Sequence, residues 1–144
     1  MREILFRGKR VDNGEWETGS LVYARLGTSE EQASIADKMT AYHTPVIPET
    51  VGQYTGLTDK NGTRIFEGDI IKSEQDGMIG VIRFGEYRTT NSGNGECHLG
   101  FSIEWYGKYS DLLRRDLEWW VKFGNTDINI FGNIHDNPEL LKGE

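Results

Sequence analysis

Three acidic side chains in the middle of the chain have the types and the spacing that carboxylate chemistry would need. Asp59, Glu67 and Asp69 lie in the stretch QYTGLTDKNGTRIFEGDIIK, residues 53–72. Carboxylates that converge in a cleft can act as general acid and base or bind a divalent metal ion, and would then serve a metal-dependent hydrolase. Asp equally suits turns, where it accepts hydrogen bonds from nearby backbone N–H groups. Because the stretch is rich in turn residues, we interpret these acids as turn-forming and assign no catalytic residue and no metal ligand.

The histidines and the cysteine do not form a recognisable ligand or nucleophile pattern. His43, His98 and His135 are far apart in the sequence, and no HxxxH or HExxH spacing occurs. Cys97 directly precedes His98, and neighbouring side chains on a strand point to opposite faces. The glycines form neither GxGxxG nor GxxxxGK[ST], the loops that bind phosphate groups. The sequence therefore predicts no zinc site, no Cys–His nucleophile and no cofactor.

The aromatic residues leave two kinds of binding surface open. A small barrel with exposed rings could stack single-stranded nucleic acid, with arginine and lysine residues as a basic rim. The formal net charge of −7 weighs against a broad phosphate-binding surface. Rings left over after the core is filled could instead form a protein–protein or self-association surface. The candidate binding surface comprises Tyr54, Asp59, Glu67, Asp69, Tyr87 and Arg88.

The middle of the chain predicts a β-hairpin at the centre of the fold. Residues 59–62 (DKNG) form a tight-turn sequence, because Asn and Gly tolerate the positive φ that such turns require. Residues 70–84 then predict two strands joined at Asp76-Gly77. Apolar side chains occupy both faces of residues 78–84 (MIGVIRF), so we expect this strand to be covered on both sides.

The flanking regions predict further strands and a few short helices. Residues 3–25 favour an N-terminal hairpin around Asp12-Asn13-Gly14, with a bulge at Gly19. Residues 27–44 fit either a short helix over 30–39 or an irregular excursion. Residues 118–123 (EWWVKF) could be helical, but their composition favours a strand. The other expected elements are a helical turn at 48–51, a loop over 85–95, a strand over 99–105, a helix over 110–116, a strand over 127–134, and a C-terminal helix with Asn137 as N-cap and Pro138 as its first residue.

Several of these segments also carry a family resemblance. Residues 53–62 (QYTGLTDKNG), followed by residues 66–70 (FEGDI), resemble the central motif of the YopX family of phage and prophage proteins. Residues 1–7 (MREILFR), 46–52 (VIPETVG) and 131–141 (FGNIHDNPELL) resemble other parts of that family, in the same order. The resemblance implies a phage- or prophage-encoded accessory protein, and the family provides no enzymatic activity that could be carried onto residues here.

Length and composition complete the expectation. The chain has 144 residues, 36% of them hydrophobic, enough for one domain. One cysteine excludes an internal disulfide, and no apolar run suits a signal peptide or a membrane span, so we expect a soluble, intracellular protein. The phage or prophage origin that the resemblance implies would make this the cytoplasm of the bacterial host. We predict a mainly β (or α+β) single domain over residues 1–144, with a hairpin region and excursion over 1–45 and a barrel core over 46–144. The core would be a small SH3-like barrel or a strongly bent antiparallel sheet.

We expect a protein that acts by binding an unknown protein partner or by self-assembly into an oligomer, without enzyme activity. A single-stranded nucleic-acid-binding module and a metal-dependent hydrolase are the alternatives.

Overall fold

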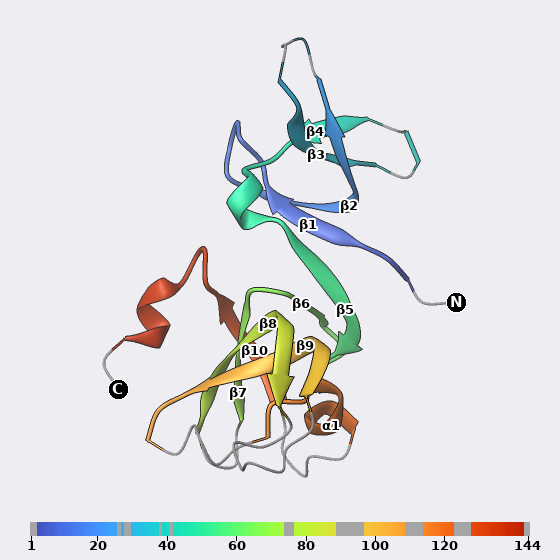
Figure 1. Cartoon of the computed structure of the whole chain (residues 1–144). Coiled ribbons are helices and arrows are strands. Elements are labelled where there is room, and N and C mark those ends of the chain that lie inside the picture. Colours follow the sequence, from blue (N-terminus) through green and yellow to red (C-terminus); the bar gives the residue numbers. More distant parts are fainter. Residues whose placement is uncertain are drawn as a thin grey trace. The chain divides into compact units, whose positions relative to one another are not determined.

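The computed structural model describes residues 3–25, 27, 30–37, 39–40, 42–73, 77–88, 97–108, 114–122 and 128–142. Strands dominate these residues and form two antiparallel sheets, so the mainly β expectation is confirmed. The chain divides into two compact units, residues 1–56 and 57–144, and strand β5 (Gly52–Thr58) runs from one into the other. Figure 1 shows the order of the elements. No helix in the described part is long and apolar enough to cross a membrane.

The first unit begins with the expected hairpin. Strand β1 (Phe6–Lys9) pairs antiparallel with β2 (Trp16–Ala24), and Lys9 lies opposite Trp16. The turn between them is stabilised by the side chain of Asn13, whose Oδ1 accepts the N–H of Glu15 at 2.9 Å. This turn is the local chemistry that the DNG sequence predicts.

Residues 27–44 contain strands, so both the short helix and the irregular excursion were wrong for the part that the structure describes. Strand β3 (Gln32–Ala36) lies between β2 and β4 (His43–Pro45), and its backbone pairs on both sides. Ala33 and Ile35 alternate inward, where they form a small buried cluster with Val46. Pairing with a strand on each side makes residues 32–36 extended, although their weak apolar pattern did not favour a strand.

Gly19 lies where strand β2 changes its pairing partner, and the pairing shows no bulge there. The register between β1 and β2 has no shift up to Gly19, and β2 pairs with β3 from Ser20 onward. A Cβ atom on Gly19 would collide with the carbonyl oxygen of Ala36. Glycine is therefore required here because two backbones approach closely.

The expected helical turn forms near the end of the first unit, as the 3₁₀ helix η1 (Pro48–Thr50). The hydroxyl oxygen of Thr50 accepts the N–H of Lys9 at 2.9 Å and donates to the carbonyl oxygen of Ile47 at 2.6 Å. Strand β5 then pairs antiparallel with β1.

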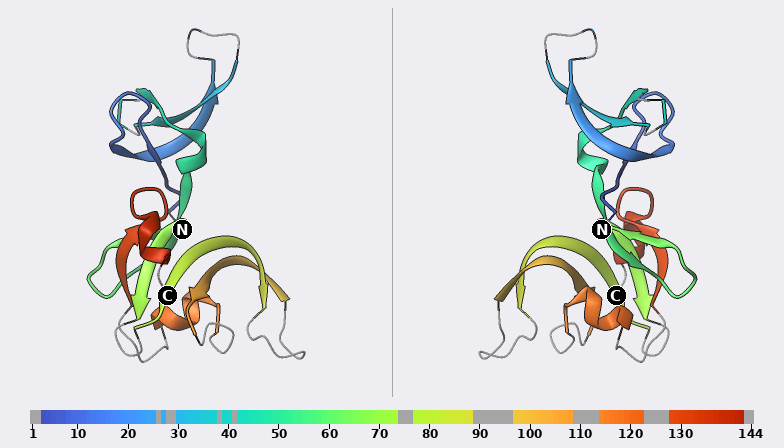
Figure 2. Two further views of the ribbon diagram at one scale, coloured as in Figure 1. Left: turned by 90° about the vertical axis from the view of Figure 1, so that its left-hand side faces the viewer. Right: turned by 90° about the vertical axis from the view of Figure 1, so that its right-hand side faces the viewer.

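The second unit is organised around the expected central hairpin. Strand β7 (Asp69–Ser73) pairs antiparallel with β8 (Ile79–Arg88), in a sheet with the order β10-β7-β8-β9. Strand β6 (Arg64–Phe66) precedes this hairpin. Strand β9 (Cys97–Tyr106) pairs with β8 over its whole length, and Figure 2 shows how strongly these two strands curve. Among the described residues the sheet does not close into a barrel.

Strand β8 is covered on both faces over part of its length only. Gly80, Val81 and Ile82 are buried, whereas Phe84 is 53% exposed. The strand also continues to Arg88, so the loop expected from residue 85 was wrong for residues 85–88, and residues 89–96 lie outside the described part.

Residues 117–122 form helix α1 (Leu117–Lys122), so the preferred strand was wrong. Leu117 and Trp120, three positions apart, are both buried in the main core of the unit. Lys122 forms an ion pair with Glu118 at 2.8 Å, one turn earlier. The indole N–H of Trp120 donates to the carbonyl oxygen of Arg114 at 2.8 Å. These contacts require helical spacing and outweigh the β-propensity of Trp and Val. The helix expected over residues 110–116 lies mostly outside the described residues.

The chain ends with strand β10 (Ile128–Asn133) and the 3₁₀ helix η3 (Pro138–Leu141). The pairing of strand β10 with β7 contains a register shift between Ile130 and Gly132. The sequence had predicted an irregularity of this kind only at Gly19. Pro138 begins the final helix as expected. The side chain of Asn137 does not cap that helix. Its Oδ1 accepts the N–H of Asn133 at 3.3 Å instead.

Candidate functional site

The carboxylate of Asp59 binds backbone groups from two parts of the second unit. Its Oδ1 accepts the N–H groups of Asn61 and Thr63, both at 2.9 Å. Its Oδ2 accepts the N–H of Ile130, 71 positions further along the chain, at 3.2 Å. Asp59 is 8% exposed, and Gly62 in the same turn has φ of 82°. Asp59 thus shapes a tight turn and fastens it to strand β10.

Asp69 has a similar task at the next turn. Its Oδ2 accepts the N–H of Phe66 at 2.7 Å, and the residue is 2% exposed. Glu67 lies within the turn that this bond spans and is half-buried. Within the described residues, no group of three or more His, Cys, Asp and Glu side chains is arranged to hold a metal ion. The three acids therefore do not assemble into one cation-binding group.

The other candidate residues are distributed over both units. Tyr54 belongs to strand β5 in the first unit, is 9% exposed, and donates its backbone N–H to the carbonyl oxygen of Leu5 at 2.8 Å. Tyr87 and Arg88 lie at the end of strand β8 in the second unit. The ring of Tyr87 lies beside that of His98 on β9, with 5.5 Å between centroids.

The environment of Tyr87 disfavours the ionised form of its phenol. Burial raises the pKa of Tyr87 above its usual value of about 10, and the carboxylates of Asp116 and Glu118 act in the same direction. The cation of Arg114 opposes them. Tyr87 therefore keeps a hydroxyl proton to donate in neutral solution.

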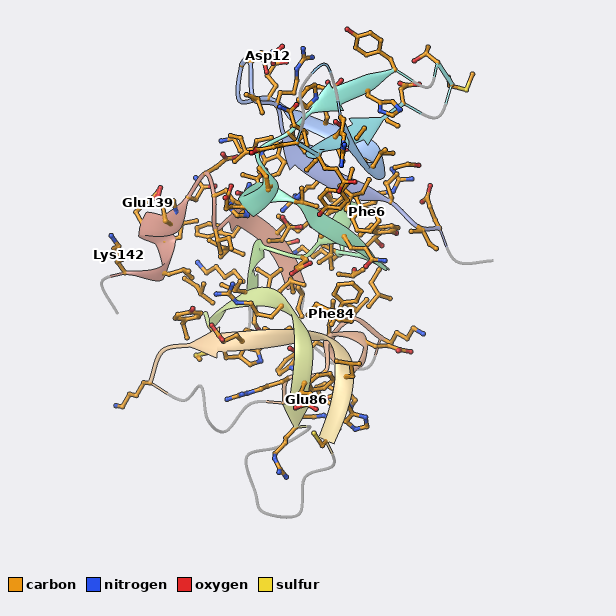
Figure 3. The ribbon with its side chains drawn as sticks, turned by 45° about the horizontal axis from the view of Figure 1, so that its top comes forward. Phe6, Asp12, Phe84, Glu86, Glu139 and Lys142 are labelled. Atoms are coloured by element: carbon orange, nitrogen blue, oxygen red, sulfur yellow. The ribbon has the colours of Figure 1, made fainter. Side chains whose placement is uncertain are left out.

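The opposite side of the same two strands presents large apolar side chains. We call this surface the hairpin face, and it comprises Phe84, Glu86, Arg88, Cys97, Leu99 and Phe101. Leu99 is 72% exposed and Phe84 is 53% exposed. Phe84 lies opposite Phe101, with ring centroids 5.1 Å apart in an edge-to-face contact. Figure 3 labels Phe84 and Glu86 on β8. This apolar surface continues outward from the core positions Ile82 and Ile103 on the same side.

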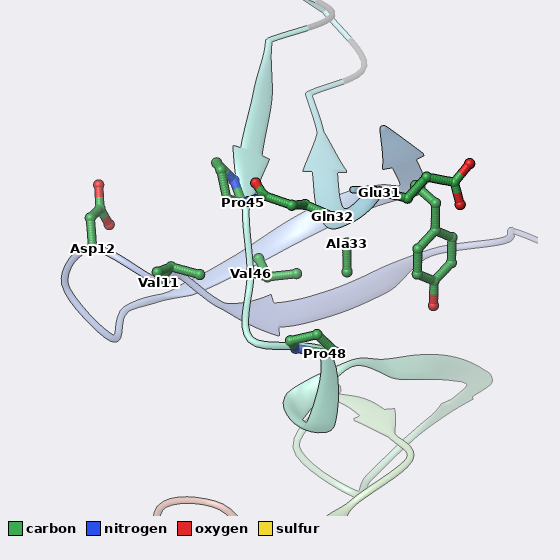
Figure 4. Close-up of a pocket in the computed structure, with 9 residues that line it drawn as sticks. Val11, Asp12, Glu31, Gln32, Ala33, Pro45, Val46 and Pro48 are labelled. Atoms are coloured by element: carbon green, nitrogen blue, oxygen red, sulfur yellow. The ribbon is translucent and has the colours of Figure 1, made fainter. Parts of the chain in front are cut away.

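The first unit contains a groove of about 510 Å³, which we call the first-unit groove. Its floor includes Ala33 and Val46, which are 3% and 2% exposed. Its walls include the exposed side chains of Val11, Tyr23 and Pro48. Asp12 and Glu31 lie at opposite ends of it (Figure 4). The sequence did not predict this groove, because its residues come from four separate segments and none of them is distinctive by itself.

These observations define a class of protein: a mainly β chain with two antiparallel sheets, in which Asp59 and Asp69 accept hydrogen bonds from backbone N–H groups. The chain belongs to the YopX family, because the family model "YopX protein" matches residues 5–142. Among solved structures it resembles the crystal structure of protein EF1440 from Enterococcus faecalis, with 21% sequence identity and a TM-score of 0.53. That match covers 99% of this chain and 100% of the other, and it shows the fold alone. No curated protein matches the chain.

Proposed function

We propose that this protein is a phage- or prophage-encoded accessory protein that acts in the host cytoplasm by protein–protein contact, without enzyme activity. Its first partner is a second copy of itself, bound through the hairpin face. The observation that carries the proposal is the exposure of Leu99 and Phe84 beside the half-buried Phe101. We also propose that the curved β7–β8–β9 sheet is part of an SH3-like barrel.

Exposed apolar side chains gathered on one face favour burial against a partner. Transfer of a leucine side chain from water into a contact contributes about 1.5–3 kcal/mol. Strand β9 is also an edge strand of the described four-stranded sheet. Edges of this kind are natural templates for pairing with another chain.

The charges on the hairpin face favour a second copy as the partner. A two-fold interface brings the same surface of two copies together, so the surface must be complementary to itself. Glu86 lies opposite Leu99, and Arg88 lies opposite Cys97 in a neighbouring pair on the same face. One acidic and one basic residue beside an apolar centre can pair with their counterparts across a two-fold axis.

Light scattering after size-exclusion chromatography tests this proposal. We expect the mass of the wild-type chain to rise towards that of a dimer as its concentration increases. Leu99→Ser should weaken self-association by about 3 kcal/mol, or about a hundredfold, because each of two copies contributes one leucine. Phe131→Ser is the matched control, since Phe131 is 49% exposed in the same unit but lies outside the hairpin face. A monomer at every concentration, or equal effects of the two variants, would contradict the proposal.

A second candidate function is supported by the Tyr87 and His98 rings, which lie side by side, and by Arg114, whose cation is close enough to act on Tyr87. Aromatic rings near a basic residue can stack the bases of single-stranded nucleic acid. A salt-sensitive mobility shift of single-stranded DNA that Tyr87→Ala abolishes would support this function. Absence of binding at low salt would remove it.

A further inference from the structure

We propose that the first-unit groove binds an extended apolar segment of a partner protein, with one lysine or arginine next to that segment. This proposal is independent of the hairpin face, because all the residues that carry it belong to residues 1–56.

The shape and lining of the groove suit a short peptide. Its volume of about 510 Å³ is within the range of sites that bind small ligands or a few side chains. Tyr23 provides an aromatic wall, the kind of surface that extended, proline-containing segments contact in other binding modules, and Pro45 and Pro48 add apolar surface. Tyr23 is 60% exposed, so its ring is accessible to a partner.

The floor of the groove is already rigid without a ligand. Val46 donates its N–H to the carbonyl oxygen of Ala33 at 3.0 Å, and both side chains are buried in one cluster with Ile35. A Cβ atom on Gly8 would lie 2.9 Å from Val46, so glycine lets strand β1 support the floor closely. A floor held in this way costs little entropy when a partner binds.

The charges at the two ends select the sign of the partner. Asp12 is neutralised by Arg10, which forms a two-pronged pair with its carboxylate at 2.8 and 2.9 Å. The exposed side chain of Glu31 forms no ion pair or hydrogen bond with the described residues. No lysine or arginine is among the described residues that line the groove. A cation of the partner near Glu31 would therefore meet a carboxylate that pairs with no lysine or arginine in the described part of the chain, whereas an acidic residue there would be repelled.

Selection of random peptides displayed on phage, with the whole chain as bait, tests the proposal. We expect enrichment of apolar or proline-containing peptides with a lysine or arginine at one end. Fluorescence anisotropy of the most enriched peptide then measures its Kd for four variants. Glu31→Lys should weaken binding about tenfold or more and Tyr23→Ser about fivefold or more, since each removes a contact at the proposed site.

Two variants are matched controls in the same unit. Tyr42→Ser removes a tyrosine that is 72% exposed and lies outside the groove, and Glu15→Lys reverses an exposed carboxylate outside it. Both should change the Kd by less than about twofold.

Enrichment of acidic peptides, no enrichment at all, or equal effects of the groove variants and their controls would overturn the proposal. A second copy of the chain as occupant would also overturn it. That occupant would appear as a loss of dimer in Tyr23→Ser by light scattering, without any peptide being selected. Because Leu99→Ser leaves the groove intact, it should still bind the selected peptide, so failure of self-association and failure of peptide binding are distinguishable.

Discussion

Asp59→Ala tests whether the acids of the middle stretch hold backbone in place. The substitution removes the acceptor for three backbone N–H groups, two in the turn and one on strand β10. A hydrogen bond to a charged acceptor contributes about 1.5–3 kcal/mol, and a buried donor left without a partner costs about 1–3 kcal/mol. The donors of Asn61 and Thr63 belong to exposed residues and can turn to water, which reduces the loss. We therefore expect the free energy of unfolding to fall by about 2–4 kcal/mol.

Asp59→Asn separates the contributions of the two carboxylate oxygens. An asparagine can keep the carbonyl oxygen that faces Asn61 and Thr63, but its amide group would then present a donor to the N–H of Ile130. We expect a loss of about 1–2 kcal/mol, between those of the wild type and Asp59→Ala. If Asp59 were instead retained for catalysis at the expense of stability, Asp59→Asn would leave stability unchanged or raise it.

Urea denaturation followed by tryptophan fluorescence is the assay, because Trp105, Trp119 and Trp120 all belong to the second unit. Glu118→Gln is the control: its ion pair with Lys122 is as short as 2.8 Å, but both side chains are more than half exposed. Such a pair contributes about 0.5 kcal/mol or less. The reasoning is refuted if Asp59→Ala unfolds at the same urea concentration as Glu118→Gln.

Three further predictions follow from other contacts. In urea denaturation, Gly80→Ala should lower the free energy of unfolding by about 1–3 kcal/mol, because the new methyl group would collide with Ile103. The control Gly100→Ala, on an open part of β9, should change the free energy of unfolding by less than about 0.5 kcal/mol. The N–H groups of Thr40 and Met39 lower the pKa of Asp37 in the folded state. Its carboxylate therefore contributes stability above the unfolded-state pKa, and that stability is lost as the pH falls through the lower folded pKa. Asp37→Asn should flatten the decline of the melting temperature between about pH 5 and about pH 2.5. Trp120→Phe should cost about 1 kcal/mol in the same denaturation assay, because it deletes the indole donor to Arg114 and keeps an aromatic ring.

The turns and the central hairpin could be predicted because their causes are local. Asn13, Asp59 and Asp69 each accept a backbone N–H within four residues, so residue type and spacing contain most of the necessary information. The same reasoning identified Asp59 and Asp69 as turn-forming. It could not identify the bond from Asp59 to Ile130, which depends on where strand β10 lies.

Strand β3 and helix α1 were the main errors, and they share one physical reason. Both are short, and intrinsic propensity over five or six residues amounts to a few tenths of a kcal/mol per residue. Pairing with β2 and β4 settled the first, and burial of Leu117 and Trp120 in the core settled the second. These partners lie elsewhere in the chain, so no local pattern contained the answer.

The sequence by itself determined the family, the predominance of strands, and the chemistry of the tight turns, because these depend on residue order and short-range hydrogen bonds. The tertiary structure alone decided which surfaces are left to bind something. The first-unit groove and the hairpin face consist of residues whose types and spacing are common in strands, so the sequence pattern does not single them out. Their exposure follows from how far each core extends along its strands, and that is a property of packing.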